Sequence, residues 1–104
     1  MKIRTTDNKG IHLTRNGITF SIQFGTGNYC ENRDKISSVD QYSKKPDTTS
    51  TDCEVAVFKD GGEWITYLAF PEEGEHQEGS VDVVGYVPIE KAFQRFWEFT
   101  NETN

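Results

Sequence analysis

At 104 residues, the chain has room for one domain over residues 1–104, and its 12% of aromatic residues can form a small core of rings. Its net charge of −6 at pH 7 and the lack of a dense basic stripe argue against general binding of duplex nucleic acid. No apolar run approaches the ~18 residues that cross a membrane, and the N-terminal MKIRTTDNKG lacks the apolar stretch of a secretory signal. We therefore expect a cytoplasmic domain without a membrane partner.

The clearest structural pattern is a hairpin in IHLTRNGITFSIQF, residues 11–24. Asn16-Gly17 is a typical two-residue hairpin turn, because both central positions of that turn need a positive φ. After the turn, apolar and polar residues alternate from Ile18 to Phe24, which is the period of a half-buried strand. Ile11 and Leu13 supply the apolar face of the partner strand.

The stretch QFGTGNYCENR, residues 23–33, ends this strand with two glycines, an asparagine, a tyrosine, a cysteine and an arginine. Closely spaced glycines allow backbone N–H groups to bind an anion, and Arg33 or Lys35 would add positive charge. The third glycine and the βαβ unit of a dinucleotide-binding fingerprint are missing. The stretch is therefore first a turn after a strand, and second a candidate ligand-binding loop.

Residues 35–52 form a long polar segment, rich in Ser and Thr and interrupted by Pro46, that predicts a loop. We expect a second hairpin in CEVAVFKDGGEWITYLAF, with strands on either side of Asp60-Gly61-Gly62 and its end at Pro71. The alternation in its second strand rests on Trp64, Thr66, Leu68 and Phe70.

The acidic segment 71–80 follows as a solvated loop, and SVDVVGYV predicts one further strand. The C-terminus then changes period, because PIEKAFQRFWEF repeats large apolar residues every three or four positions. Pro88 suits the first position of a helix. The apolar stripe expected to face the sheet is Ile89, Ala92, Phe93, Phe96 and Trp97. Together these patterns predict an α+β fold: an antiparallel sheet of four to five strands, from two hairpins plus one strand, with one C-terminal helix packed on it.

The two cysteines, Cys30 and Cys53, suit a cytoplasmic protein as free thiols, although a disulfide between them stays open. Neither they nor His12 and His76 have the spacing of a zinc site, so we expect no metal and no cofactor. Catalysis by Cys30 would need a histidine base, and a cysteine at a strand end is more often a small buried hydrophobe. We therefore expect no catalytic residue and no enzyme.

Charge is unevenly distributed along the chain. Residues 1–51 carry eight Lys and Arg against five Asp and Glu, whereas residues 52–104 carry three against twelve. Such polarity can steer a partner or support contact between subunits, and it is also compatible with an ordinary charged surface.

Three pieces of the chain together resemble a group of small bacteriophage proteins: Ser21 to Arg33, Cys53 to Phe58, and Gly85 to Ile89 with the helix behind it. The resemblance implies a fold and a source but no established activity. Small acidic bacteriophage proteins often bind a host molecule, so it implies a non-enzymatic protein of the host cytoplasm that counters bacterial defence. The expected partner is a small immune nucleotide or a host defence protein.

For a nucleotide, the N–H groups of Gly25, Gly27 and Asn28 would hold phosphate, Tyr29 would stack on a base, and Asn32 with Arg33 would add hydrogen bonds and charge. Because such sites often form between subunits, we expect a homo-oligomer. The full candidate ligand-binding set is Gly25, Gly27, Asn28, Tyr29, Cys30, Asn32 and Arg33.

Other functions compete with sequestration of a nucleotide. The acidic second half could instead cover a nucleic-acid-binding groove on a host complex, which predicts binding that weakens steeply with salt. A structural or accessory bacteriophage protein without a host target is a further alternative, and a small hydrolase built on Cys30 is a weaker one.

Overall fold

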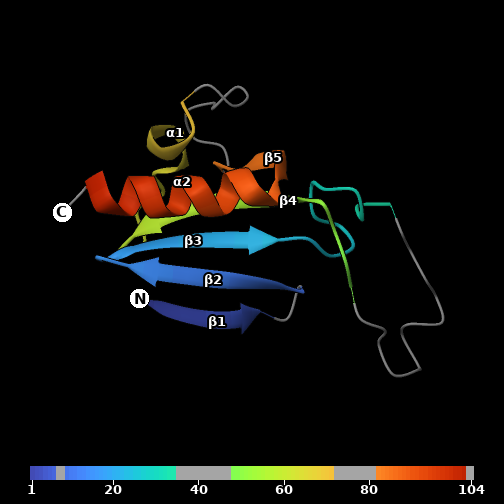
Figure 1. Ribbon diagram of the computed structural model, residues 1–104, viewed down its shortest axis with the longest axis horizontal. Coiled ribbons are helices and arrows are strands. Elements are labelled where there is room, and N and C mark those ends of the chain that lie inside the picture. The colour runs from blue at the N-terminus through green and yellow to red at the C-terminus, as the bar shows by residue number, and fades with distance from the viewer. Residues whose placement is uncertain (7–8, 35–47, 72–81, 103–104) are drawn as a thin grey trace.

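The computed structural model describes residues 1–6, 9–34, 48–71 and 82–102, and these form a five-stranded antiparallel sheet covered on one face by helix (Figure 1). The strands lie in the sheet in chain order, β1-β2-β3-β4-β5. The α+β fold with a C-terminal helix on an antiparallel sheet is thus confirmed. The bounds are β1 Lys2–Thr6, β2 Gly10–Arg15, β3 Ile18–Gln23, β4 Asp52–Lys59, α1 Thr66–Ala69, β5 Val84–Pro88 and α2 Ile89–Glu102.

The first predicted hairpin is confirmed as β2 and β3. Asn16 and Gly17 have φ values of 55° and 76°, as their turn requires. The register pairs Leu13 with Phe20, so that the apolar residues of both strands lie on the same face.

The second predicted hairpin is wrong beyond its turn. Trp64 makes a single bridge to Phe58, and the chain then leaves the sheet to form the short helix α1. The Thr66 hydroxyl accepts a hydrogen bond from the Val57 N–H at 2.8 Å and so takes the place of a ladder partner. The neighbouring edge of β4 pairs with β5, which excludes residues 66–70 from the sheet.

The fifth strand predicted near the C-terminus is confirmed as β5, and the remaining strand is β1, for which we predicted no element. β1 contains one large apolar residue, Ile3, and it lies at the edge of the sheet, where polar residues are tolerated. The expected number of strands is therefore right, with β1 in the place that we gave to residues 64–70.

The core lies between one face of the sheet and the two helices. The Phe20 ring lies 5.3 Å from the ring of Phe96, 5.9 Å from that of Phe70 and 6.2 Å from that of Phe99. Ala69 of α1 belongs to the same buried cluster. In Figure 1, α2 lies in front of the sheet, so the opposite sheet face points away from the viewer.

The predicted stripe of α2 needs correction. Ala92 and Phe96 are buried, but Phe93 and Trp97 are 42% and 55% exposed, and Phe99 is buried instead. The helix begins at Ile89, because Pro88 is the last residue of β5 and not the first of the helix. The guanidinium of Arg15 lies 3.8 Å from the centre of the Trp97 ring and partly covers it.

Two predicted loops fall largely outside the described residues. Of the polar segment 35–52, residues 48–51 lead into β4 without regular structure and Asp52 is the first residue of that strand. The acidic segment 71–80, with His76, lies outside the described residues except for Pro71. Among the described residues, neither helix is long and apolar enough to cross a membrane.

Candidate functional site

The candidate ligand-binding loop runs from Phe24 to Asp34, directly after β3, and is held together by bonds between its own residues. The N–H of Gly27 donates to the carbonyl of Arg33 at 3.1 Å, and that of Asn28 donates to Gly25 at 3.2 Å. The Asn28 side chain accepts in turn from the Gly25 N–H at 3.0 Å. Gly27 has a φ of 88°, which favours glycine. The glycines and Asn28 therefore build the turn itself.

Carboxylates fasten this loop to the start of β4. The Tyr29 N–H donates to Glu54 at 2.8 Å, and the Glu31 N–H donates to Asp52 at 2.7 Å. The Glu31 carboxylate also accepts from the N–H of Thr51. Three negative charges are thus placed along the attachment of the loop.

Asn32 braces the loop from within. It is 4% exposed, and its side-chain amide donates to the carbonyl of Phe24 at 2.7 Å and to that of Thr49 at 2.9 Å. Both donors of the amide are used, so this side chain ties the end of β3 to the segment that leads into β4.

This geometry bears on the phosphate hypothesis. The N–H groups of Gly25, Gly27 and Asn28 each have an acceptor inside the loop, and a phosphate would have to compete with those acceptors. It would also lie near the carboxylates of Glu31 and Asp52, which repel it. Ligand binding by the seven residues stays a prediction, while the structure gives these N–H groups a part in holding the loop together.

The Tyr29 side chain lies on the outside of the loop against β5. The backbone carbonyl of Tyr29 accepts a hydrogen bond from the Tyr86 N–H at 2.9 Å. A Cβ added at Gly85 would lie 2.6 Å from the Tyr29 Cβ, so the two backbones pack closely. The guanidinium of Arg33 lies 4.8 Å from the centre of the Tyr29 ring. Of the predicted ligand residues, Tyr29 and Arg33 therefore have side chains that face solvent together.

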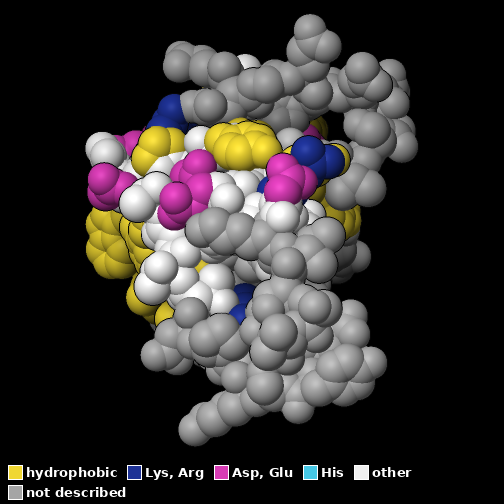
Figure 2. All heavy atoms as spheres, turned by 90° about the vertical axis from the view of Figure 1, so that its right-hand side faces the viewer, with side chains coloured by type: hydrophobic (Ala, Val, Ile, Leu, Met, Phe, Trp, Pro, Cys, Tyr) yellow, Lys and Arg dark blue, Asp and Glu magenta, His cyan; other side chains and the backbone are white. Residues whose placement is uncertain are grey.

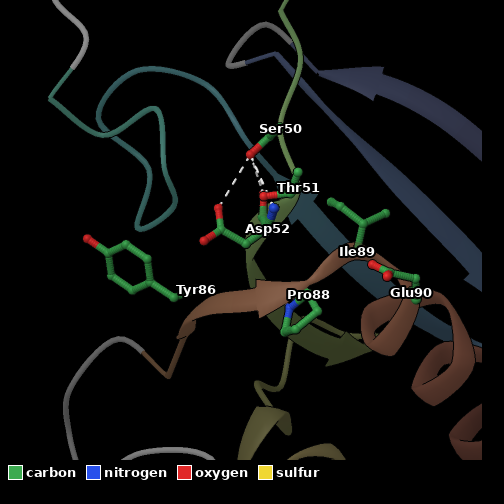
Figure 3. Close-up of a pocket in the computed structure, with 7 residues that line it drawn as sticks. All are labelled: Ser50, Thr51, Asp52, Tyr86, Pro88, Ile89 and Glu90. Atoms are coloured by element: carbon green, nitrogen blue, oxygen red, sulfur yellow. Dashed lines mark hydrogen bonds between the residues drawn. The ribbon is translucent and has the colours of Figure 1, made fainter.

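Tyr86 adopts a backbone conformation that is rare for a large side chain. Its φ is 56°, and it lies in a bulge where two residues of β5, Gly85 and Tyr86, stand opposite Glu54 alone. The Tyr86 ring is 55% exposed. The bulge turns this ring away from the core and toward the end of the molecule that carries the loop (Figure 3).

An open hollow of about 680 Å³ lies beside Tyr86, between β4 and the start of α2. Figure 3 shows Tyr86 on one side, Ile89 and Glu90 on the other, and Asp52 between them. At this end of the molecule, Figure 2 shows acidic side chains next to apolar surface on the part that the structure describes. The hollow is lined by Ser50, Thr51, Asp52, Tyr86, Pro88, Ile89 and Glu90.

None of these lining residues was among the predicted ligand residues. Gly85-Tyr86 belongs to a stretch that we singled out by resemblance, but the φ of Tyr86 leaves no mark in the sequence. Asp52 and Glu90 are 38 positions apart in the chain and line the same hollow only because β5 pairs with β4 and α2 follows at once. A sequence pattern cannot bring such residues together.

Both thiols are free and buried. Burial raises the pKa of Cys30, and burial with the nearby charge of Asp52 raises the pKa of Cys53 to about 12. A thiol with a raised pKa is a poor nucleophile at neutral pH. His12, the histidine within the described residues, lies on β2, where its Nδ1 accepts from Arg4 at 2.8 Å.

Comparison with known proteins finds no family model, no curated protein and no solved structure that matches this chain.

Proposed function

We propose that this protein is a non-enzymatic binding protein that blocks a component of bacterial defence, and that its acidic hollow receives a basic side chain of that partner. The observation that carries the proposal is the half-exposed Tyr86 ring, held by a strained backbone at a hollow that also contains Asp52 and Glu90. Backbone strain of this kind concentrates at functional sites. The bacteriophage setting rests on the resemblance of three sequence segments.

The chemistry of the hollow suits a long basic side chain. A guanidinium can lie over the Tyr86 ring and donate to the carboxylate of Asp52 beside it, while Glu90 adds negative charge on the other side of the hollow. The apolar stem of the same side chain would lie along Pro88 and Ile89. Arginine fits such a place better than lysine, because its planar group combines stacking with two parallel hydrogen bonds.

The charge around the hollow favours the same partner. Glu31 and Glu54 add their carboxylates at the attachment of the loop, and the guanidinium of Arg33 lies at the end of its described part. A protein that binds nucleic acid presents basic side chains in its groove, so this end of the molecule is complementary to it. A nucleotide is less well accommodated, since its phosphates would meet these carboxylates.

A titration with a short oligoarginine peptide at low salt tests the proposal. We expect Tyr86→Ala to weaken binding about three- to fivefold, the size of an exposed cation–π contact. Glu90→Gln should weaken binding about two- to fivefold. Matched controls are Tyr67→Ala, an exposed tyrosine of α1, and Glu98→Gln, an exposed carboxylate of α2, and both should leave the affinity unchanged. An equal loss in Glu98→Gln would show that net charge alone attracts the peptide, and an equal loss in Tyr67→Ala would show that the Tyr86 ring has no special part in binding.

A thermal-shift series with cyclic oligonucleotides, cyclic ADP-ribose isomers and plain nucleotides tests the competing hypothesis. A nucleotide at a hundredfold excess over its Kd would stabilise the fold by about 2.7 kcal/mol. Such a shift, abolished by Tyr29→Ala and Arg33→Ala, would replace the proposed basic partner with a nucleotide at the loop.

The role in defence has its own measurement. Bacteria that carry a nucleic-acid-cutting defence complex are infected with and without expression of the chain, and plaques are counted. We expect more plaques with the native chain and fewer with Tyr86→Ala or Glu90→Gln at equal protein levels. Unchanged plaque numbers over a panel of such complexes would contradict the proposed function.

A further inference from the structure

The sheet face opposite the core carries its own set of aligned side chains. We call this face, which neither helix covers, the open face, and the strand register shows which side chains lie on it. Its outward side chains on β1 to β4 include Lys2, Arg4, His12, Thr14, Thr19 and Phe58.

Planar groups form a continuous row across the open face. The Arg4 guanidinium donates to His12 at 2.8 Å, and the His12 ring meets the Phe58 ring edge-on with 5.7 Å between centres. The Phe58 ring lies 5.7 Å from that of Trp64, which is 44% exposed. The side chains of β3 beneath this row are small, which allows His12 on β2 to reach Phe58 on β4 across the intervening strand.

Hydroxyl groups line the middle of the same face. Thr14 and Thr19 lie opposite each other on β2 and β3 with their hydroxyl oxygens 2.8 Å apart. Such hydroxyls donate and accept hydrogen bonds equally well. The face thus combines rings with neutral polar groups, unlike the apolar surface that a second sheet or a lipid layer would cover.

Among the described residues of β1 to β4, the open face carries Lys2 and Arg4 against Glu54, although the whole chain carries −6. Lys2 and Arg4 are exposed on β1, the edge strand. The carboxylate of Glu54, which shares the face by register, is drawn toward the loop by the Tyr29 N–H. Lys59 is paired with Glu63 at 2.8 Å beside Trp64, so that pair adds no net charge.

The cations and the exposed rings of the open face favour one kind of partner. A second copy that paired through β1 would bring Lys2 and Arg4 of both chains together, and cations on an edge strand oppose such pairing. Single-stranded nucleic acid offers what the face lacks: phosphates for cations, and unpaired bases whose faces stack on aromatic rings. A duplex keeps its bases stacked inside and cannot use the rings.

We propose that the open face binds single-stranded nucleic acid, with Lys2 and Arg4 on phosphates and the Trp64 ring stacked on a base. Phe58 and His12 continue the stacking surface toward β1, and the hydroxyls of Thr14 and Thr19 contact base edges. This activity is separate from the proposed acidic hollow, which lies at the end of the molecule that carries the loop.

Fluorescence anisotropy with labelled single-stranded oligonucleotides, measured on the full chain at low salt, tests this proposal. We expect Trp64→Ala to weaken binding about tenfold, the cost of losing one stacked base. Trp97→Ala removes the other tryptophan, which lies on α2 beside Arg15, and should leave binding unchanged. Arg4→Ala should reduce the slope of log K against log salt by about 0.7, the share of one phosphate contact with a single strand. Lys91→Ala, an exposed cation on α2, should not change the slope.

Tryptophan emission gives a second readout that does not depend on affinity differences. In Trp97→Phe the remaining tryptophan is Trp64, and stacking on a base should quench its emission. In Trp64→Phe the remaining Trp97 should keep its emission with the same oligonucleotide. The absence of binding at low salt would overturn the proposal. So would a duplex that binds as tightly as the single strand, or polyglutamate that displaces the labelled strand as well as an unlabelled one does, because neither competitor offers unpaired bases.

Discussion

The loop at the end of the molecule and the open sheet face use their polar groups in opposite ways. In the loop, the Gly25 N–H donates to the Asn28 side chain, the Asn32 amide donates to backbone carbonyls, and the Glu54 carboxylate accepts from a backbone N–H. On the open face, strand pairing satisfies the backbone, and side chains such as Lys2 and Trp64 extend outward. Glycines, asparagines and carboxylates, which suggest a binding site in the sequence, thus stabilise the loop itself. The side chains of ordinary strand residues are the ones that remain available to a partner.

The largest expected effect on stability comes from replacing Asn32, which holds the loop together. Asn32→Ala removes both hydrogen bonds of a buried amide and leaves the carbonyls of Phe24 and Thr49 without that partner. We expect a loss of about 2–3 kcal/mol in the free energy of unfolding, measured by urea denaturation. Arg4→Ala on the open face should stay within about 0.5 kcal/mol.

Asn101→Ala is the matched control, since Asn101 is exposed near the end of α2. If Asn32→Ala and Asn101→Ala were equally mild, the loop would not depend on its internal bonds, and its polar groups would be free to serve a ligand.

The next effect concerns the contact between the loop and β5. A Cβ at residue 85 would lie 2.6 Å from the Tyr29 Cβ, so Gly85→Ala forces the loop away from the strand. We expect a cost of about 1–3 kcal/mol in thermal or chemical unfolding. In a double-mutant cycle, Tyr29→Gly removes the opposing Cβ and should cancel most of that cost. Additive effects would contradict the close packing of Tyr29 on Gly85.

The patterns that predicted the fold correctly are those in which a local rule and the tertiary structure agree. Asn16-Gly17 sets its own turn, and the three- and four-residue spacing around Phe96 sets α2. The alternation from Trp64 to Phe70 failed because β5 competes for β4, a competition between segments that no window of sequence contains. β1 was missed because an edge strand can be polar.

Of the two candidate sites, the sequence indicated the loop and not the hollow, and ligand binding at the loop stays a prediction. The sequence located the loop, and with it Tyr29 and Arg33, whose side chains do reach solvent. The sequence did not indicate that the glycine N–H groups would donate to acceptors within the loop, because those acceptors depend on the conformation of the loop. The hollow depends on the bulge at Tyr86, whose φ follows from pairing with β4.

A smaller effect has the opposite sign. Tyr86→Gly relieves the strain of a left-handed backbone conformation, which costs a non-glycine residue about 1–2 kcal/mol. Against this gain, the greater backbone entropy of glycine in the unfolded chain costs about 0.5–1 kcal/mol. We expect the protein to become more stable by up to about 1 kcal/mol while it loses affinity for the oligoarginine peptide. Tyr67→Gly, in the interior of α1, should instead destabilise the fold by about 1 kcal/mol. Destabilisation by both substitutions would remove the case for strain at Tyr86.

The smallest effect depends on pH and belongs to the open face. Burial, and then the positive charge of the adjacent Arg4, lower the pKa of His12 from its usual 6.5. The unfolded chain therefore takes up this proton at a higher pH than the folded protein. The stabilising contribution is complete above pH 6.5 and is lost as the pH falls through the lower folded pKa.

Urea midpoints of the native chain and of His12→Gln, compared over this pH range, isolate the contribution. The groups that face His12 are Arg4 on β1, Ser21 on β3 and Phe58 on β4, so Arg4 is the charged neighbour among them. We expect the difference between the two proteins to shrink as the medium becomes acidic, and protonation to turn the Arg4 contact from attraction to repulsion. A difference that grows on acidification would contradict this account, because it would mean that the folded protein stabilises the charged form of His12.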